Sequence, residues 1–328
     1  MFSVVIPLYN KAHTIAATLN SVLLQTFTEF EVIIINDGST DDGIDVIKKF
    51  TQDPRIHIYN QNNQGVSAAR NKGVALSKYD YIAFLDGDDE WVPNFLGKIK
   101  DAIELYPKAG MYGTSSWHVN ILTGEKKEST LKKYKNKIKI VDYFDNPHHM
   151  PHTSAMVISK ESFNNIFKDG NGFPIGMKCC EDFACFYRIA LRVPFVYIGF
   201  PLGIRNSGVP GQITNSGNEI RFQLLKHVMD FYNISFTSYH ELNKKHNLYD
   251  IFFKYDIRNR FISHLRINDY RSITYILNHS GELIINQFSN VELSMYRDPK
   301  YRWISILYIY YTKIIFKFSK YLTSYQLS

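Results

Sequence analysis

Two carboxylates separated by a single glycine, Asp86 and Asp88, directly follow an apolar segment at residues 81–85. Carboxylates that leave the end of one strand together offer hard oxygen ligands to Mg²⁺ or Mn²⁺, which commonly complete their shells with substrate phosphates. The alternative is an acidic turn that caps the next helix, because Asp and Gly favour turns for local reasons. The tripeptide alone leaves both interpretations open.

A second acidic pair, Glu181 and Asp182, opens a helix expected at residues 181–191. A carboxylate at this position could take the proton of a substrate hydroxyl. The alternative is that both acids only interact with the positive end of the helix dipole, which is common.

Two further polar side chains could contact a nucleotide. Asp37 follows the apolar segment 32–35, and its carboxylate could accept hydrogen bonds from a base or a ribose, unless it only forms a capping turn. Arg70 lies on a helix expected at residues 63–73 and could pair with a carboxylate or a phosphate. A solvent-exposed arginine is the alternative.

The elements that position these residues alternate along the first hundred residues. Strands are expected at residues 2–6, 31–35, 56–59 and 81–85, and the segments between them carry apolar residues at helical spacing. This alternation predicts an α/β fold, a Rossmann-like, mostly parallel sheet flanked by helices. Ligands bind at the carboxyl ends of such strands, where the polar clusters lie.

The rest of the chain is less regular. Residues 121–140 contain seven lysines and few apolar residues, which indicates a solvated loop or hairpin. Further strands are expected at residues 154–159 and 195–198, and the Gly- and Pro-containing segment 203–217 indicates a boundary or a mobile loop. We therefore predict a first domain at 1–217 and a helical C-terminal region at 218–328.

Composition excludes several classes of protein. With 328 residues of which 45% are hydrophobic, the chain can bury a core and is not disordered throughout. Its three cysteines lie within seven residues, which excludes a disulfide framework. We find no secretory signal and no apolar run long enough to span a membrane, so we expect a cytoplasmic protein. The net charge of +7 suits a phosphorylated ligand or an anionic membrane, whereas the basic residues lack the aromatic stripe typical of nucleic-acid binding.

Four segments together resemble the family-two, GT-A-fold glycosyltransferases. The matching segments are residues 4–10, 34–41, 65–73 and 84–89. The resemblance is tight over about residues 1–110, extends loosely through Glu181 and Asp182 to about residue 210, and does not cover the final third. It implies an inverting enzyme that moves a sugar from a nucleotide-diphosphate donor, with uridine the expected nucleotide, to a hydroxyl of a cell-surface polysaccharide, lipopolysaccharide or lipid-linked oligosaccharide precursor.

The resemblance also implies roles for single residues. Pro7, Tyr9 and Asn10 would line the nucleotide, Asp37 would contact the base, and Arg70 would belong to the same wall.

In the acidic clusters, Asp86 would face the ribose or the metal shell, and Asp88 would hold a divalent cation, Mn²⁺ or Mg²⁺, against the diphosphate. Asp182 would be the general base, with Glu181 beside it as a substrate-binding residue. In the context of the upstream segments we favour this role over helix capping.

Arg205 stands where the family often carries a Tyr-Arg or His-containing segment. Here Ile204 replaces the tyrosine and no histidine is near, so the third metal ligand is unassigned and Arg205 could instead clamp the diphosphate. His148, His149 and His152 are expected in an exposed loop near the acceptor entrance, without a metal role.

Two other functions compete with this interpretation. One is a glycosyltransferase-like binding protein without turnover, against which the intact Asp37, Asp86, Asp88 and Asp182 argue. The other is a sugar nucleotidyltransferase, which would need a Gly-rich phosphate loop after the first strand, and residues 7–10 offer none.

The tail at residues 302–322 carries an amphipathic helical pattern. Its predicted apolar face comprises Ile304, Leu307, Tyr308, Tyr311, Ile315, Phe318 and Leu322. Lys313, Lys317 and Lys320 fall on another stripe, so the helix suits the anionic inner face of a membrane. Packing on the protein's own core or on a second subunit of a homo-oligomer is the alternative.

Overall fold

A computed structural model describes residues 1–145, 150–209, 218–242 and 247–326 of the chain. These residues form two compact units, Met1–Ser216 and Gly217–Ser328.

The first unit is built on one mixed sheet with strands in the order β3-β2-β1-β4-β9-β6-β10-β5. Its N-terminal half comprises β1 (Phe2–Leu8), β2 (Phe30–Asp37), β3 (Ile56–Gln61) and β4 (Tyr81–Phe84). The neighbouring pairs among these four are parallel, which confirms the four predicted strands and brings their carboxyl ends to one edge.

The other half of the sheet contains both directions. The strand β9 (Met156–Ser159) runs antiparallel between β4 and β6 (Met111–Asn120), and β10 (Phe195–Ser207) is parallel to β6. Two register irregularities around Pro201 let β10 continue past residue 198. Residues 203–207, predicted as part of a loop, therefore belong to a strand, because they pair with β6. Residues 210–217 lie outside the described part of the chain.

The lysine-rich segment contributes three short elements. The strand β7 (Lys126–Glu128) forms the predicted hairpin with β6. A 3₁₀ turn, η1 (Lys132–Tyr134), leads to β8 (Ile138–Val141), which pairs with β10 and was not expected from the sequence. The edge strand β5 (Glu90–Trp91) pairs with the far part of β10.

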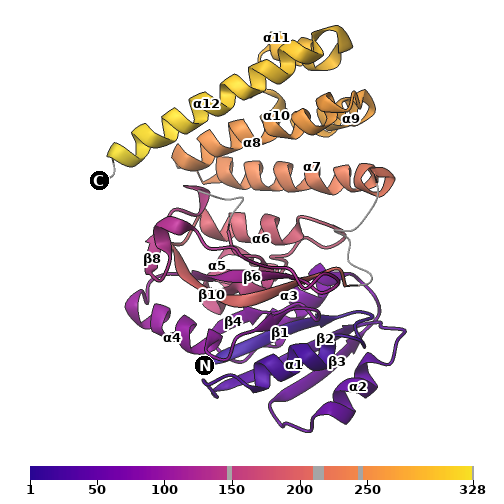
Figure 1. Cartoon of the computed structure of the whole chain (residues 1–328), viewed down its shortest axis with the longest axis vertical. Coiled ribbons are helices and arrows are strands. Elements are labelled where there is room, and N and C mark those ends of the chain that lie inside the picture. The colour runs from indigo at the N-terminus through magenta and orange to yellow at the C-terminus, as the bar shows by residue number, and fades with distance from the viewer. Residues whose placement is uncertain (146–149, 210–217, 243–246, 327–328) are drawn as a thin grey trace. The chain divides into compact units, whose positions relative to one another are not determined.

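Helices cover both faces of this sheet (Figure 1). They are α1 (Ile15–Leu23), α2 (Gly43–Phe50), α3 (Val66–Leu76), α4 (Phe95–Leu105), α5 (Lys160–Ile166) and α6 (Glu181–Ala190). Alternate residues of β1 serve the two faces: Val4 and Ile6 join a core with residues of α1 and α4, whereas Val5 meets α3. A Cβ atom on Gly73 would lie 2.2 Å from Val5 Cγ1, so glycine is what lets α3 approach β1 this closely.

The second unit is helical and rich in aromatic residues, as predicted (Figure 1). Its helices are α7 (Asn218–Glu241), α8 (Asn247–Arg266), α9 (Tyr270–His279), α10 (Glu282–Ile285), α11 (Asn290–Arg297) and α12 (Arg302–Gln326). Phe236 and Phe253 stack at 4.0 Å between α7 and α8, and Arg258 forms a buried ion pair with Glu292 at 2.8 Å. Among the described residues, we find no helix with the length and apolar character needed to cross a bilayer.

The predicted amphipathic helix is present as α12, but it packs through a different face. Ser305, Ile306 and Ile309 are buried, while Ile304 and Leu307 of the predicted apolar face are exposed. The side chains of Phe318 and Leu322 lie outside the described part.

Candidate active site

The loops that follow β1 and β2 are hydrogen-bonded to each other at the edge of the sheet. Asn10 adopts a left-handed backbone conformation, with φ of 52°, and its Oδ1 accepts a hydrogen bond from the Thr40 backbone N–H at 2.8 Å. The Asn10 N–H in turn donates to Ser39 Oγ at 3.1 Å. The predicted nucleotide residues Pro7, Tyr9 and Asn10 therefore adjoin the loop after Asp37, because β1 and β2 are parallel neighbours.

The Asp37 carboxylate is held by the start of α3. It accepts hydrogen bonds from Gln61 Nε2 at 2.8 Å and from the backbone N–H groups of Gln64 at 2.9 Å and Gly65 at 2.8 Å. A carboxylate at a helix N-terminus is stabilised by the helix dipole. Any contact of Asp37 with a nucleotide base would be made in addition to these bonds.

Arg70 connects the two acidic clusters. Its Nη2 atom lies 2.7 Å from Asp86 Oδ1 and its Nη1 atom 2.9 Å from Glu181 Oε1, and its side chain is only 4% exposed. The alternative of a solvent-exposed arginine is therefore wrong. Burial acts to raise the pKa of Asp86, but the charge and hydrogen bond of Arg70 lower it below its ordinary value. Arg70 thus positions an ionised Asp86 and ties β4 to the start of α6.

We expect Arg70→Met to destabilise the first unit strongly, because it leaves the Asp86 and Glu181 carboxylates without their shared partner. Removing one member of a buried ion pair costs about 3–5 kcal/mol. The matched control is Arg55→Met, which breaks a more exposed pair with Asp53 and should cost about 1 kcal/mol or less. Urea unfolding measures both losses, and equal losses would contradict the positioning role of Arg70.

The turn after β4 concentrates acidic groups. Asp88 Oδ2 lies 2.6 Å from Lys11 Nζ, a partner that was not predicted from the sequence. Asp89 is buried, and it accepts hydrogen bonds from Ser154 Oγ at 2.6 Å and from the Asn206 backbone N–H at 3.0 Å. Burial, together with the nearby charges of Asp86 and Asp88, raises the pKa of Asp89 to about 8. Asp89 therefore links the turn to β10 through its hydrogen bond from Asn206.

The chemistry of this turn fits a divalent cation. Within the described ranges, no group of three or more His, Cys, Asp or Glu side chains is arranged to hold a metal ion. Asp86 and Asp88 nevertheless supply oxygen donors from one turn, and an ion bound at Asp88 would displace the Lys11 ammonium group, which lies 2.6 Å from Asp88 Oδ2. A Mg²⁺ or Mn²⁺ ion bound by one or two carboxylates completes its shell with water and phosphate oxygens.

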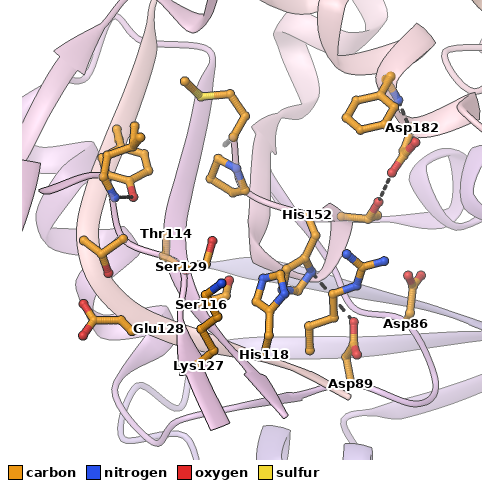
Figure 2. Close-up of a pocket in the computed structure, with 18 residues that line it drawn as sticks. Asp86, Asp89, Thr114, Ser116, His118, Lys127, Glu128, Ser129, His152 and Asp182 are labelled. Atoms are coloured by element: carbon orange, nitrogen blue, oxygen red, sulfur yellow. Dashed lines mark hydrogen bonds and ion pairs between the residues drawn. The ribbon is translucent and has the colours of Figure 1, made fainter. Parts of the chain in front are cut away.

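A cavity of about 580 Å³ lies beside this turn (Figure 2). Three of the predicted site residues, Asp86, Asp182 and Arg205, line it together. In Figure 2 the acids Asp86 and Asp182 lie toward one side of the cavity, and Ser116 and Ser129 lie toward the other. Hydroxyl and carboxylate side chains around one cavity can form hydrogen bonds with the hydroxyl groups of a sugar ring.

Asp182 and Glu181 are adjacent in sequence but have different surroundings. Asp182 lines the cavity, where its Oδ2 accepts a hydrogen bond from Thr153 Oγ1 at 3.0 Å and its Oδ1 accepts one from the Phe183 backbone N–H at 2.8 Å. Glu181 is buried against Arg70, and burial together with the charge of Asp182 raises its pKa. Of the pair, Asp182 has the carboxylate that faces the cavity.

Several residues of the cavity were not identified from the sequence. His152 was expected in an exposed loop, but this is wrong: it lines the cavity, with Nδ1 3.8 Å from Asp89 Oδ2. Burial and the nearby Arg205 and His118 lower the pKa of His152 to about 3, so its ring is neutral. His148 and His149 lie outside the described residues. Lys127, from the lysine-rich hairpin, also lines the cavity.

Residues 3–167 match the family model described as Glycosyl transferase family 2. Parts of the chain are also similar to several named relatives. It is 42% identical over 92 residues to the uncharacterized glycosyltransferase YibD of Escherichia coli K12, a match that spans 28% of this chain and 27% of that protein.

Two other relatives have more specific names. The UDP-Glc:alpha-D-GlcNAc-diphosphoundecaprenol beta-1,3-glucosyltransferase WfaP of Escherichia coli is 45% identical over 92 residues, which span 28% of this chain and 37% of WfaP. The putative teichuronic acid biosynthesis glycosyltransferase TuaG of Bacillus subtilis is 40% identical over 100 residues, 30% of this chain and 40% of TuaG. The matches thus cover well under half the length of these relatives.

Among solved structures, that of S. aureus TarS residues 1–349 in complex with UDP-GlcNAc superposes with a TM-score of 0.60. The superposition covers 94% of this chain and 89% of that one at 15% sequence identity, so it shows a shared fold.

Proposed function

Because this chain belongs to glycosyl transferase family 2, we propose that it is an inverting glycosyltransferase that uses a nucleotide-diphosphate-sugar donor. The observation that carries the proposal is the cavity in which Asp182, Asp86 and Arg205 meet. The names of WfaP and of the TarS complex, which specify UDP-Glc and UDP-GlcNAc, support a uridine donor. We therefore take UDP as the nucleotide.

The acceptor that we propose is a hydroxyl of a cell-surface glycan precursor. The names of WfaP, a glucosyltransferase acting on a lipid diphosphate, and of TuaG, assigned to teichuronic acid synthesis, support this class. We also propose a cytoplasmic location for the enzyme.

In this proposal Asp182 is the general base. Its carboxylate faces the cavity, and the hydrogen bond from Thr153 fixes its orientation. The proton of the acceptor hydroxyl passes to Asp182 while the oxygen forms a bond to the anomeric carbon of the donor. The bond from that carbon to the diphosphate breaks, and its electron pair leaves with the diphosphate. Attack from the face opposite the leaving group inverts the configuration.

The remaining residues bind the donor in this proposal. Pro7, Tyr9, Asn10 and Asp37 lie around the nucleotide at the ends of β1 and β2. Asp86 and Asp88 would hold a divalent cation, which would supply a counter-charge to the diphosphate. Arg205 lines the cavity and adds a second positive charge for that group. Arg70 and Glu181 act on the donor indirectly, since they pair with each other beside Asp86.

We expect a UDP-sugar to stabilise the protein in a thermal-shift panel of nucleotide-sugars with Mn²⁺ present. Binding to the folded state alone adds about 3 kcal/mol at a ligand concentration of 100 Kd, which shifts the melting temperature by several degrees. The same samples are then assayed for release of UDP.

The panel separates the competing functions. Stabilisation by a UDP-sugar with slow UDP release supports the proposed enzyme, because transferases hydrolyse their donors slowly without an acceptor. A nucleoside triphosphate with a sugar phosphate is added to the panel, and stabilisation by that pair, without stabilisation by a UDP-sugar, would indicate a nucleotidyltransferase. Stabilisation without UDP release, in the presence of glycan acceptors, would indicate a binding protein that lacks turnover.

A further inference from the structure

The helix α12 has an exposed apolar face along its described part. Its members are Trp303, Ile304, Leu307, Tyr310, Tyr311, Ile314 and Ile315, with Leu307 68% and Trp303 65% exposed. At 3.6 residues per turn, these seven positions fall within about 140° of the helix circumference. The buried Ser305, Ile306 and Ile309 occupy the opposite side. The exposed residues therefore form one continuous surface, which we call the α12 face.

A surface of this kind is uncommon on a folded unit. Single exposed apolar residues are ordinary, but contiguous patches of large apolar side chains mark sites of interaction with a protein or a membrane. The packing of α12 against α8 already uses the other side of the helix, so folding of the second unit does not account for the α12 face.

Charge and residue type indicate which partner covers the α12 face. Residues 302–326 contain four basic residues and no acidic residue, whereas Lys300 before them forms an ion pair with Asp298 at 3.1 Å. Trp303, Tyr310 and Tyr311 combine an apolar ring with a polar group, a type of side chain that is enriched where membrane meets water. Leu307 and Ile314 supply purely apolar surface between them.

We propose that the α12 face binds the surface of an anionic lipid bilayer, with the helix lying in the plane of the interface. Basic and aromatic amphipathic helices bind in this way through buried apolar area and attraction to anionic headgroups. A second copy of the chain is the less suitable partner, because it would place two helices of net charge +4 against each other. The inference concerns the second unit and does not depend on the proposed activity.

Co-sedimentation with vesicles tests the proposal on the full chain. The vesicles contain phosphatidylcholine with phosphatidylglycerol, and vesicles of phosphatidylcholine alone serve as the uncharged reference. We expect binding to the anionic vesicles at low salt, with weaker binding as salt screens the charges. The double variant Leu307→Glu with Ile314→Glu should lose at least about tenfold in vesicle partitioning, since it places two charges in the α12 face.

The matched control introduces the same two charges elsewhere in the second unit. Ile267 and Val291 are each 68% exposed and lie outside α12, so Ile267→Glu with Val291→Glu should bind vesicles like the unmodified protein. Because all four positions are exposed, neither variant should change the melting temperature appreciably, and circular dichroism checks this.

Three results would overturn the proposal. The first is failure of the unmodified protein to bind anionic vesicles at low salt, and the second is equal binding by the two double variants. The third is a dimer in lipid-free solution that Leu307→Glu with Ile314→Glu converts to a monomer, without any vesicle binding. That third result would identify the α12 face as an interface between copies of the chain.

Discussion

Replacing Asp182 by asparagine should lower the rate of sugar transfer by about two to four orders of magnitude while leaving donor binding nearly unchanged. Asparagine keeps the shape of the side chain, and its amide oxygen still accepts the hydrogen bond that Thr153 donates at 3.0 Å. It lacks the basic lone pair that takes the proton of the acceptor hydroxyl. The measurement pairs transfer kinetics with calorimetric titration of the donor.

Two comparisons make the Asp182 result specific. Asp101→Asn removes an exposed acid on α4 that pairs with Lys98, and it should leave transfer within about twofold of the unmodified protein. Glu181→Gln keeps an oxygen acceptor for Arg70 and should retain much more transfer than Asp182→Asn. Near-normal transfer by Asp182→Asn would mean that this carboxylate only caps α6. If only Glu181→Gln lowered the rate of sugar transfer, Glu181 would be the general base instead.

Asp88→Ala should abolish the dependence of donor binding on the divalent cation. The variant removes one of the two carboxylates that would hold the ion, so the diphosphate loses its main counter-charge at the site. The ratio of UDP affinities with and without Mn²⁺, measured by calorimetry, is the decisive quantity. For the unmodified protein we expect at least about a tenfold ratio, and for Asp88→Ala a ratio near one.

The ratio of affinities with and without Mn²⁺ is more informative than the affinity alone, because Lys11 pairs with Asp88 and could replace the metal in the variant. In Asp88→Ala the ammonium group of Lys11 loses its partner at 2.6 Å and becomes available to the diphosphate, so some binding without metal should persist. Lys11→Met is the matched control, because it removes the ammonium group and keeps both carboxylates, and its binding should stay dependent on Mn²⁺. An undiminished ratio in Asp88→Ala would rule out Asp88 as a metal ligand.

The sequence by itself was sufficient to predict the parallel half of the sheet and the edge where polar residues gather. Runs such as residues 32–35 are apolar and β-branched, and the helical spacing between the runs leaves few alternatives to a strand-helix alternation. Since all parallel strands end at one edge, the loops after residues 8, 37 and 85 had to lie near one another. These features depend on local periodicity, which a sequence displays directly.

The partners of the charged residues were decided by tertiary structure. Arg70 and Glu181 are 111 positions apart, and Lys11 and Asp88 are 77 apart, so no local pattern indicates that they pair. Likewise, His152 faces the cavity because β9 enters the sheet antiparallel between β4 and β6. Periodicity does not encode that insertion, since strand order depends on packing between distant segments.

The tail shows the same division between local and distant information. The spacing in residues 302–322 predicts a helix with an apolar face, and α12 is that helix. Which face of α12 packs depends on the surfaces that α8 and α11 offer, and the buried side comprises Ser305, Ile306 and Ile309, which leaves the more apolar side exposed. An amphipathic pattern identifies an apolar face, but only the neighbouring helices determine whether that face is buried within the protein or remains open to a partner.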